Sequence, residues 1–234
     1  MAKTTLSLSL SLSLPRVVIV DDASQTRETF QVAYPGLDVV GSFSSVTALL
    51  AQKPPAEVVV LDLMLSTSLD ERILQGPRAV KELSTQGYRV CVYTDERRPL
   101  VLARCFSAGA CGLVRKSDRL SDNQAAFIRV AAGQIVVPRS MVGLAEILSR
   151  RKALPSLTPR QTEVLAARAR GEAWDALSRR LGISSKTAQD HLEAVMSKMV
   201  LFLRETGLNP SASPADIERT LGLAPGDLDD PWGY

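Results

Sequence analysis

Two neighbouring carboxylates, Asp21 and Asp22, directly follow an apolar run at residues 17–20. Like charges repel each other, and each is costly to move away from water. Such a pair is therefore expected either at a water-exposed strand end or around a divalent cation. Carboxylate oxygens are the ligands that Mg²⁺ prefers, and this ion commonly links a carboxylate to a phosphate.

Three further polar residues, Asp62, Thr94 and Lys116, stand at the ends of later apolar runs. Parallel strands bring their carboxyl ends to one edge of a sheet, so these side chains and the acid pair are expected to meet in one crevice. A hydroxyl and an ammonium beside carboxylates supply donors for phosphoryl oxygens. The spacing therefore indicates phosphoryl chemistry at a magnesium site.

Five short, β-branched runs alternate with amphipathic helical segments between residues 16 and 133. Each run is apolar nearly throughout, which is typical of a parallel sheet covered on both faces. The expected strands cover 16–20, 37–43, 57–62, 89–94 and 112–116, and the expected helices cover 24–34, 45–52, 77–86, 98–109 and 122–133. The pattern predicts an α/β fold, a doubly wound five-stranded parallel sheet with its site at the carboxyl ends of the strands.

Residues 16–133 resemble the receiver domain of two-component response regulators, because an acid pair, a lone Asp, a Thr and a Lys follow the first, third, fourth and fifth strands. The resemblance implies that Asp62 accepts a phosphoryl group from a sensor histidine kinase. It also implies that Asp21, Asp22 and Asp62 hold Mg²⁺, and that Thr94 and Lys116 contact the phosphoryl group. The alternative is a receiver-like fold that is never phosphorylated, since a fold alone does not fix a function.

Three features depart from the family pattern. The loop 63–76 looks about six residues longer than usual, and long loops are often functional. Leu113 stands where the family's switch aromatic tends to sit. Asp95 follows Thr94, and its carboxylate would repel a phosphoryl group unless it points away. An unconventional switch is therefore expected.

A small all-α domain is expected at 156–205, after a linker with a short helix at 134–155. Thr158 is suited to cap its first helix, with Pro159 at the first helical position. Gly182 ends a second helix, and a longer third helix begins near Ser185. A short helix, a turn with Gly and a helix opened by Ser form a helix-turn-helix signature.

This stretch is similar to the LuxR/NarL-type helix-turn-helix domain. The motif residues are Leu157, Thr158, Pro159, Arg160, Glu163, Val164, Leu165, Gly171, Leu181, Ile183, Ser184, Thr187, His191, Lys198 and Met199. The resemblance implies a bacterial transcription regulator, not an enzyme, that binds double-stranded DNA as a homodimer. A receiver followed by this domain is a familiar architecture of such regulators.

The expected DNA contacts come from the third helix and the start of the first. They are Arg160, Ser185, Lys186, Thr187, Gln189, Asp190, Glu193 and Lys198. Phosphates repel the carboxylates of Asp190 and Glu193, although acidic side chains can accept from cytosine and Gln can read adenine. Binding is therefore expected to be either weak or unusually specific. In a rival interpretation, the acidic third helix binds a partner protein instead of DNA.

Charge and composition narrow the class of protein. Lys and Arg outnumber Asp and Glu between residues 150 and 200, whereas residues 206–234 form an acidic C-terminal tail. This asymmetry favours nucleic-acid contact by the basic segment. A metabolic enzyme is not expected, because no P-loop and no dinucleotide fingerprint is present. The three cysteines form no CxxC pair, which fits a reduced, cytoplasmic compartment.

The two ends of the chain carry weaker signals. Residues 1–15 are a low-complexity extension, and no segment approaches the roughly 20 apolar residues of a membrane span. Phe202 and Leu203 fit either a dimer seam or the domain's own core. Trp232 and Tyr234 are suited to anchor the acidic end against a basic face, as a self-inhibiting clamp.

Overall fold

The computed structural model describes residues 13–66 and 73–225. The low-complexity extension up to residue 12 and the centre of the loop 63–76 lie outside the described residues. The acidic end, with the predicted clamp residues Trp232 and Tyr234, lies outside them as well.

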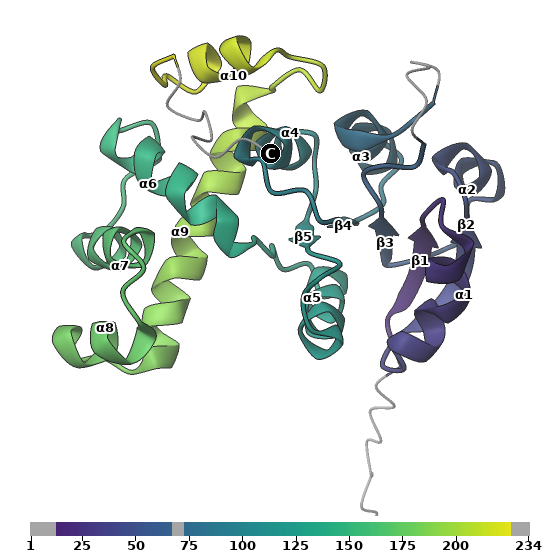
Figure 1. Ribbon diagram of the computed structural model, residues 1–234, viewed down its shortest axis with the longest axis horizontal. Helices are drawn as coiled ribbons and strands as arrows, with labels where there is room; N and C mark the ends of the chain where they lie inside the picture. Colours follow the sequence, from purple (N-terminus) through teal and green to yellow (C-terminus); the bar gives the residue numbers. More distant parts are fainter. Residues whose placement is uncertain (1–12, 67–72, 226–234) are drawn as a thin grey trace, which may run out of the picture.

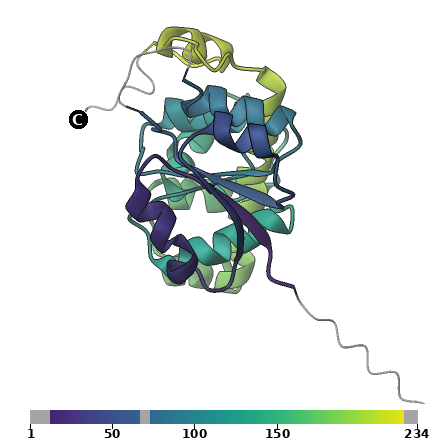
Figure 2. The ribbon, with the colours of Figure 1, turned by 90° about the vertical axis from the view of Figure 1, so that its right-hand side faces the viewer.

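A five-stranded parallel sheet forms the centre of the first part of the chain (Figures 1 and 2). The strand order is β2-β1-β3-β4-β5, which reverses between β1 and β3 and so places the binding crevice at the carboxyl ends of these two strands. The predicted strands are confirmed within two residues at each end. They are β1 (Arg16–Val20), β2 (Asp38–Phe43), β3 (Val58–Leu61), β4 (Val90–Tyr93) and β5 (Gly112–Val114).

Helices cover both faces of this sheet (Figure 2). Alternate residues of β1 explain the layers: Val17 and Ile19 pack with helices α1 and α5, whereas Val18 and Val20 pack with α2, α3 and α4. The helices are α1 (Ser24–Ala33), α2 (Val46–Gln52), α3 (Gly76–Thr85), α4 (Pro99–Ser107) and α5 (Leu120–Ala131). We call the segment from β1 to α5 the sheet unit.

The described chain from residue 142 onward is helical, as the sequence predicts, and we call residues 142–225 the helical unit. Thr158 caps α7 in a reciprocal capping box with Gln161, and Gly182 ends α8 with a φ of +63°, which glycine adopts without strain. The elements after α5 are η1 (Arg139–Met141), which precedes this unit, and then α6 (Val142–Arg150), α7 (Pro159–Ala169), α8 (Trp174–Leu181), α9 (Ser185–Thr206) and α10 (Pro214–Thr220). No helix of the described part is both long enough and apolar enough to cross a membrane.

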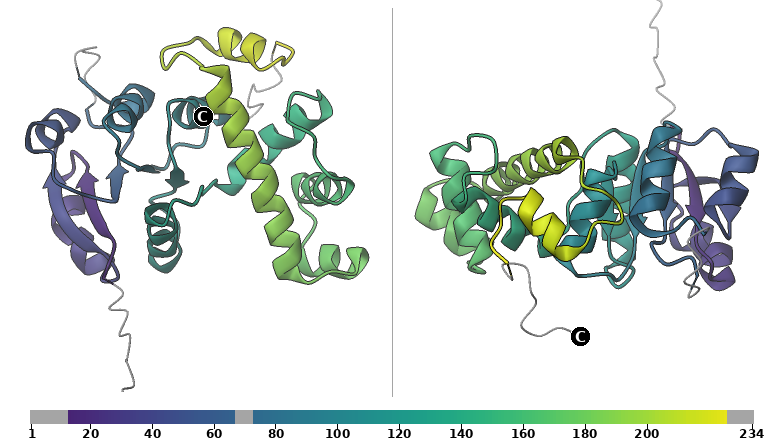
Figure 3. Two further views of the ribbon diagram at one scale, coloured as in Figure 1. Left: turned by 180° about the vertical axis from the view of Figure 1, so that it is seen from behind. Right: turned by 90° about the horizontal axis from the view of Figure 1, so that it is seen from above.

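The two units share one hydrophobic core. Helix α9 lies between α4 of the sheet unit and the helices α6–α8, as Figures 1 and 3 show. Leu203 of α9 is fully buried in the same cluster as Leu102 of α4. Nη2 of Arg204 donates to the carbonyl oxygen of Ala110 at 2.8 Å. Leu203 therefore belongs to the chain's own core, which answers the question that the sequence left open.

The first part of the predicted tail also belongs to this core. Leu208, Ile217 and Leu221 are buried in it, and α10 holds Ile217 there. Nη1 of Arg104 on α4 lies 3.4 and 3.3 Å from the carbonyl oxygens of Pro210 and Ala212. The buried side chains of this segment thus share a core with α4 and α9, and its backbone contacts the sheet unit through Arg104.

Candidate functional site

Three of the predicted site residues extend neighbouring strands by one position. The backbone N–H of Asp21 donates to Phe43, that of Asp62 donates to Val20, and that of Thr94 donates to Val114. These ladder bonds fix the backbone of each residue at the carboxyl edge of the sheet. The side chains of the central strands therefore meet there, as the sequence predicts.

Lys116 links the carboxylates of this crevice. Its Nζ donates to Oδ2 of Asp21 at 2.7 Å and to Oδ2 of Asp62 at 2.9 Å. The Asp21 side chain is fully buried, whereas the Asp62 side chain is 10% exposed. An incoming group can therefore reach Asp62 more readily than Asp21.

Burial and neighbouring charges shift the pKa values of two groups in the crevice. Burial raises the pKa of Asp62, and although the hydrogen bond from Lys116 lowers it, the net direction is upward. Burial alone would lower the pKa of Lys116, but its hydrogen bonds to Asp21 and Asp62 outweigh this effect and raise it. Lys116 is therefore held as an ammonium at neutral pH.

The acid residues also form a candidate cation site. One carboxylate oxygen from each of Asp21, Asp22 and Asp62 lies within 4.8 Å of the others. Asp22 is exposed, so this site is open to water on one side, as Mg²⁺ requires because it keeps several of its waters. Three carboxylates beside the single ammonium of Lys116 leave an excess of negative charge. The donor set and the charge therefore fit a hard divalent cation.

Arg27 is a site residue that the sequence analysis missed. Its Nη1 donates to the carbonyl oxygens of Asp21 at 2.6 Å and of Asp22 at 2.8 Å. The guanidinium thus holds the backbone of the acid pair from the first helical turn that follows it. A basic residue one turn into that helix is the sequence signal that would have indicated this role.

The mouth of the crevice is a cavity of about 770 Å³. Asp62, Thr94 and Lys116 line it together with Met64 and Gln75, which are described parts of the predicted long loop. The backbone N–H groups of Leu65 and Ser66 both donate to Oε1 of Gln75. These two bonds draw the described ends of the loop together beside Asp62, whose side chain is 10% exposed.

Asp95 lines the same cavity as Asp62, Thr94 and Lys116, but its carboxylate has a partner of its own. Its Oδ1 accepts a hydrogen bond from the backbone N–H of Ser117 at 3.0 Å. This hydrogen bond reduces the repulsion that the sequence predicts between Asp95 and a phosphoryl group. The next acidic residue, Glu96, forms an ion pair with Arg98 at 2.5 Å. Burial alone would raise the pKa of Glu96, but the hydrogen bonds and charge of Arg98 outweigh burial and lower it.

The predicted DNA-contact residues fall into two groups. Lys186, Thr187, Gln189, Asp190 and Glu193 are exposed on the first turns of α9. Nζ of Lys186 lies 2.5 Å from Oδ1 of Asp190, which reduces the repulsion between that acid and a phosphate. Arg160 is partly exposed beside Glu163.

The other two predicted DNA-contact residues, Lys198 and Ser185, form hydrogen bonds within the helical part of the chain. Nζ of Lys198 donates to the carbonyl oxygen of Ser156 and to Oε1 of Gln161, so it ties α9 to the start of α7. Oγ of Ser185 lies 3.1 Å from Oγ of Ser178, across the turn between α8 and α9. In this arrangement both side chains serve the packing of the helix-turn-helix.

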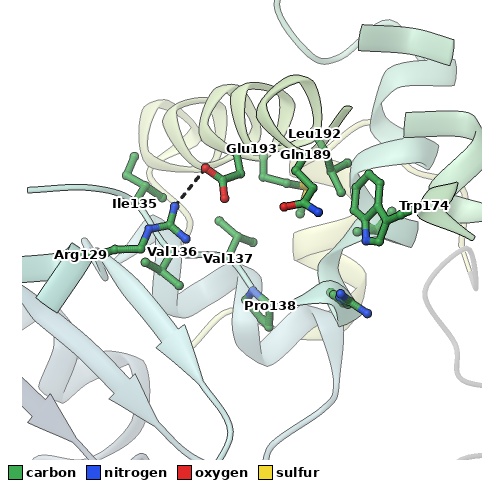
Figure 4. Close-up of a pocket in the computed structure, with 12 residues that line it drawn as sticks. Arg129, Ile135, Val136, Val137, Pro138, Trp174, Gln189, Leu192 and Glu193 are labelled. Atoms are coloured by element: carbon green, nitrogen blue, oxygen red, sulfur yellow. Dashed lines mark hydrogen bonds and ion pairs between the residues drawn. The ribbon is translucent and has the colours of Figure 1, made fainter. Parts of the chain in front are cut away.

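One exposed residue of α9 contacts the sheet unit. Oε2 of Glu193 lies 3.0 Å from Nη2 of Arg129 on α5, and Figure 4 shows this pair. Gln189 and Glu193 also line a cavity that faces Ile135, Val137 and Pro138. Part of the surface of α9 is therefore directed at the sheet unit.

Comparison with known proteins connects these features to a family. Residues 155–202 match the family described as bacterial regulatory proteins, luxR family. The probable transcriptional regulatory protein SgaR of Hyphomicrobium methylovorum is 31% identical over 188 residues, which cover 78% of this chain and 85% of that protein. The transcriptional regulatory protein LiaR of Bacillus subtilis is 26% identical, over 79% of this chain and 90% of its own length.

Solved structures share the fold. The RcsB response regulator of Salmonella typhimurium is 24% identical with a TM-score of 0.50, and the match covers 83% of this chain and 98% of that one. A structure of an RcsB–DNA complex is 23% identical, also with a TM-score of 0.50, over 84% of this chain and 100% of that one. The order of a parallel-sheet unit and a helical unit is therefore common to these proteins.

Proposed function

The chain belongs to the LuxR family of bacterial transcriptional regulators, and from this premise we propose that it is a response regulator that binds DNA under the control of phosphorylation at Asp62. The observation that carries this proposal is the ammonium of Lys116 between the carboxylates of Asp21 and Asp62. This geometry supports phosphoryl transfer because the carboxylate of Asp62 lines an open cavity beside a fixed positive charge.

Asp62 acts as the nucleophile. One of its carboxylate oxygens forms a bond to the phosphorus of a phosphohistidine on a sensor kinase, the P–N bond breaks, and its electron pair stays on the imidazole, which takes up a proton. Lys116 pairs with the phosphoryl oxygens, and the Thr94 hydroxyl donates to one of them. Mg²⁺ held by Asp21, Asp22 and Asp62 would neutralise part of the charge on the phosphoryl group.

The exposed first turns of α9 form the DNA-binding surface. Lys186 and Thr187 lie at the helix start, where side chains and backbone N–H groups suit phosphate oxygens. Once α9 is released from the sheet unit, Gln189 would read a base edge, and Asp190 and Glu193 would limit the sequences that bind. A homodimer would read two half-sites about one DNA turn apart. The protein would act in the cytoplasm, where bacterial DNA lies.

The packing of the units supports a route from phosphorylation to DNA binding. Thr94 precedes α4 by a short loop, and α4 packs against α9. A movement of Thr94 towards the phosphoryl group would therefore bias the contact between α4 and α9. In the described arrangement Arg129 engages Glu193, so we assign it to the form that binds DNA less well.

A salt-dependent gel shift on fragments of the host genome tests the DNA-binding half of the proposal. We expect the DNA affinity to fall steeply as the salt concentration rises. In Lys186→Ala, the slope of log affinity against log salt concentration should become smaller in magnitude by about one. Lys81→Ala, an exposed lysine on α3, is the matched control and leaves the slope unchanged. The absence of any shift would contradict DNA binding and favour a partner-binding role for α9.

A further inference from the structure

A cavity of about 260 Å³ lies between the two units (Figure 4). The sheet unit contributes Arg129, and the helical unit contributes Trp174 and Leu192. Val137 and Arg139 come from the segment that follows α5, which is held to the sheet unit because Val136 exchanges backbone hydrogen bonds with Cys111 and Leu113. None of the residues that line the acidic crevice lines this cavity. It is therefore separate from the phosphorylation site.

The cavity has an uncompensated positive charge on one wall. In the described part of the chain, no carboxylate pairs with Arg139. The guanidinium of Arg168 lies over the ring of Trp174, 4.3 Å from its centroid. Burial lowers the pKa of Arg168, and the proximity of Arg139 lowers it further, so these two cations repel each other beside the indole. An anion placed there would relieve this repulsion.

Apart from Glu193, whose carboxylate is paired with Arg129, the other walls suit an apolar group. Val137, Leu192 and Met196 line the cavity, and the Trp174 ring offers a flat surface. The amide of Gln189 adds a neutral hydrogen-bond donor. Drug-sized ligands occupy pockets of roughly 300–1,000 Å³, so this smaller cavity suits one ring or a short alkyl chain.

We propose that this cavity binds a small organic carboxylate with an apolar body. Its carboxylate accepts charge-assisted hydrogen bonds from Arg139 and a hydrogen bond from Gln189, and its body packs between Val137 and Trp174. The walls come from both units, so this ligand binds only while the units are in the described arrangement. Binding therefore favours this arrangement over any in which α9 is released.

The ligand is expected to weaken DNA binding, because Gln189 and Glu193 stay directed at the sheet unit while it is bound. At a ligand concentration ten times its dissociation constant, DNA affinity falls by at most about elevenfold. This consequence depends on the proposed DNA-binding function, whereas ligand binding itself does not.

Fluorescence of Trp174 reports binding directly. The chain has two tryptophans, so Trp232→Phe leaves Trp174 as the single reporter. In this background phenylacetate and hexanoate are titrated, with phenylacetamide as the uncharged control. We expect saturation by at least one acid with a dissociation constant below about 1 mM, and no saturation by the amide.

Substitution of Arg139 tests whether this residue binds the carboxylate of the ligand. Arg139→Gln, a change of an exposed side chain, is expected to weaken acid binding at least about tenfold. Arg219→Gln, on α10 and paired with Asp216, is the matched control and leaves binding unchanged. The proposal is overturned if neither acid saturates the signal up to about 10 mM, if the amide binds as well, or if Arg139→Gln binds normally.

A gel shift with and without phenylacetate or hexanoate, whichever binds, then tests the regulatory consequence. Lower DNA affinity in the unsubstituted chain but not in Arg139→Gln is the expected result. An acid that binds without any change in DNA affinity would overturn this consequence. Because the titration contains no DNA, failure of the cavity proposal and failure of the DNA-binding proposal are distinguishable.

Discussion

Lys116 donates hydrogen bonds to Asp21 and to Asp62, residues that lie 95 and 54 positions away in the chain. A single ammonium thereby joins the loop after β5 to the ends of the two central strands, β1 and β3. Its removal would leave two carboxylates close together with little solvent around the deeper one.

Lys116→Met is therefore expected to destabilise the protein. Breaking a buried pair costs about 3–5 kcal/mol, and the partial exposure of Lys116 reduces this to about 1–3 kcal/mol. The measurement is urea unfolding in the presence of a chelator. Arg115→Gln, which loses only a surface pair with Asp118, is the control and should have a small effect. An unchanged unfolding midpoint in Lys116→Met would contradict the role of the ammonium.

The raised pKa of Asp62 predicts a specific dependence of stability on pH. Burial is the largest cause of the rise above the ordinary value of 3.8, so the folded state binds the proton more tightly than the unfolded state does. The contribution of Asp62 to stability is present below 3.8 and is lost as pH rises through the raised pKa. In Asp62→Asn the amide at this position does not titrate, so this pH-dependent contribution to stability is absent.

The expected result is that Asp62→Asn becomes more stable relative to the unsubstituted chain as pH rises from 3.8 towards neutrality. Urea unfolding at a series of pH values without divalent cations measures the difference. Asp38→Asn, an exposed carboxylate at the start of β2, should show no such trend. The opposite trend for Asp62→Asn would mean that Lys116 stabilises the charged form more than burial opposes it.

Helix α9 supplies a matched pair of leucines for testing the shared core. Leu203 is fully buried among residues that include Leu102 of α4, whereas Leu201 is 49% exposed. Leu203→Ala should lower the free energy of unfolding by about 2–5 kcal/mol, because it removes buried contacts and leaves a cavity. Leu201→Ala should change it by less than about 0.5 kcal/mol. Equal effects in thermal unfolding would contradict the described packing of α9.

Arg129→Gln should increase DNA affinity. The side chains of Arg129 and Glu193 are 38% and 52% exposed. Exposed ion pairs contribute about 0.2–1 kcal/mol to the stability of the contact that they form. Loss of this pair would therefore raise affinity by at most about fivefold in a gel shift with unphosphorylated protein. Arg115→Gln, on the same unit, controls for the loss of one positive charge. Weaker binding by Arg129→Gln alone would show that Arg129 contacts DNA instead.

The sheet and the acidic crevice are predictable from sequence because local patterns determine them. Apolar runs define the strands, and the rule that parallel strands share a carboxyl edge brings Asp21, Asp62 and Thr94 together. The caps at Thr158 and Ser184 likewise follow from residue types at fixed spacings.

The contacts between units are not predictable in this way. The Arg129–Glu193 pair and the burial of Leu203 against α4 depend on how two separately patterned segments dock, and no local periodicity encodes that. Lys198 illustrates the same limit: its charge suggests a phosphate contact, but its position across from Ser156 directs it into the helical unit. Asp95 similarly pairs with a backbone N–H that the sequence does not mark.

Intact-protein mass spectrometry can show whether Asp62 accepts a phosphoryl group. The protein is incubated with a small phosphodonor and Mg²⁺, alongside Asp62→Ala and the control Asp38→Ala. We expect a gain of one phosphoryl group in the unsubstituted chain and in Asp38→Ala, and no gain in Asp62→Ala or with a chelator. No gain in the unsubstituted chain, or an equal gain in Asp62→Ala, would contradict this role of Asp62.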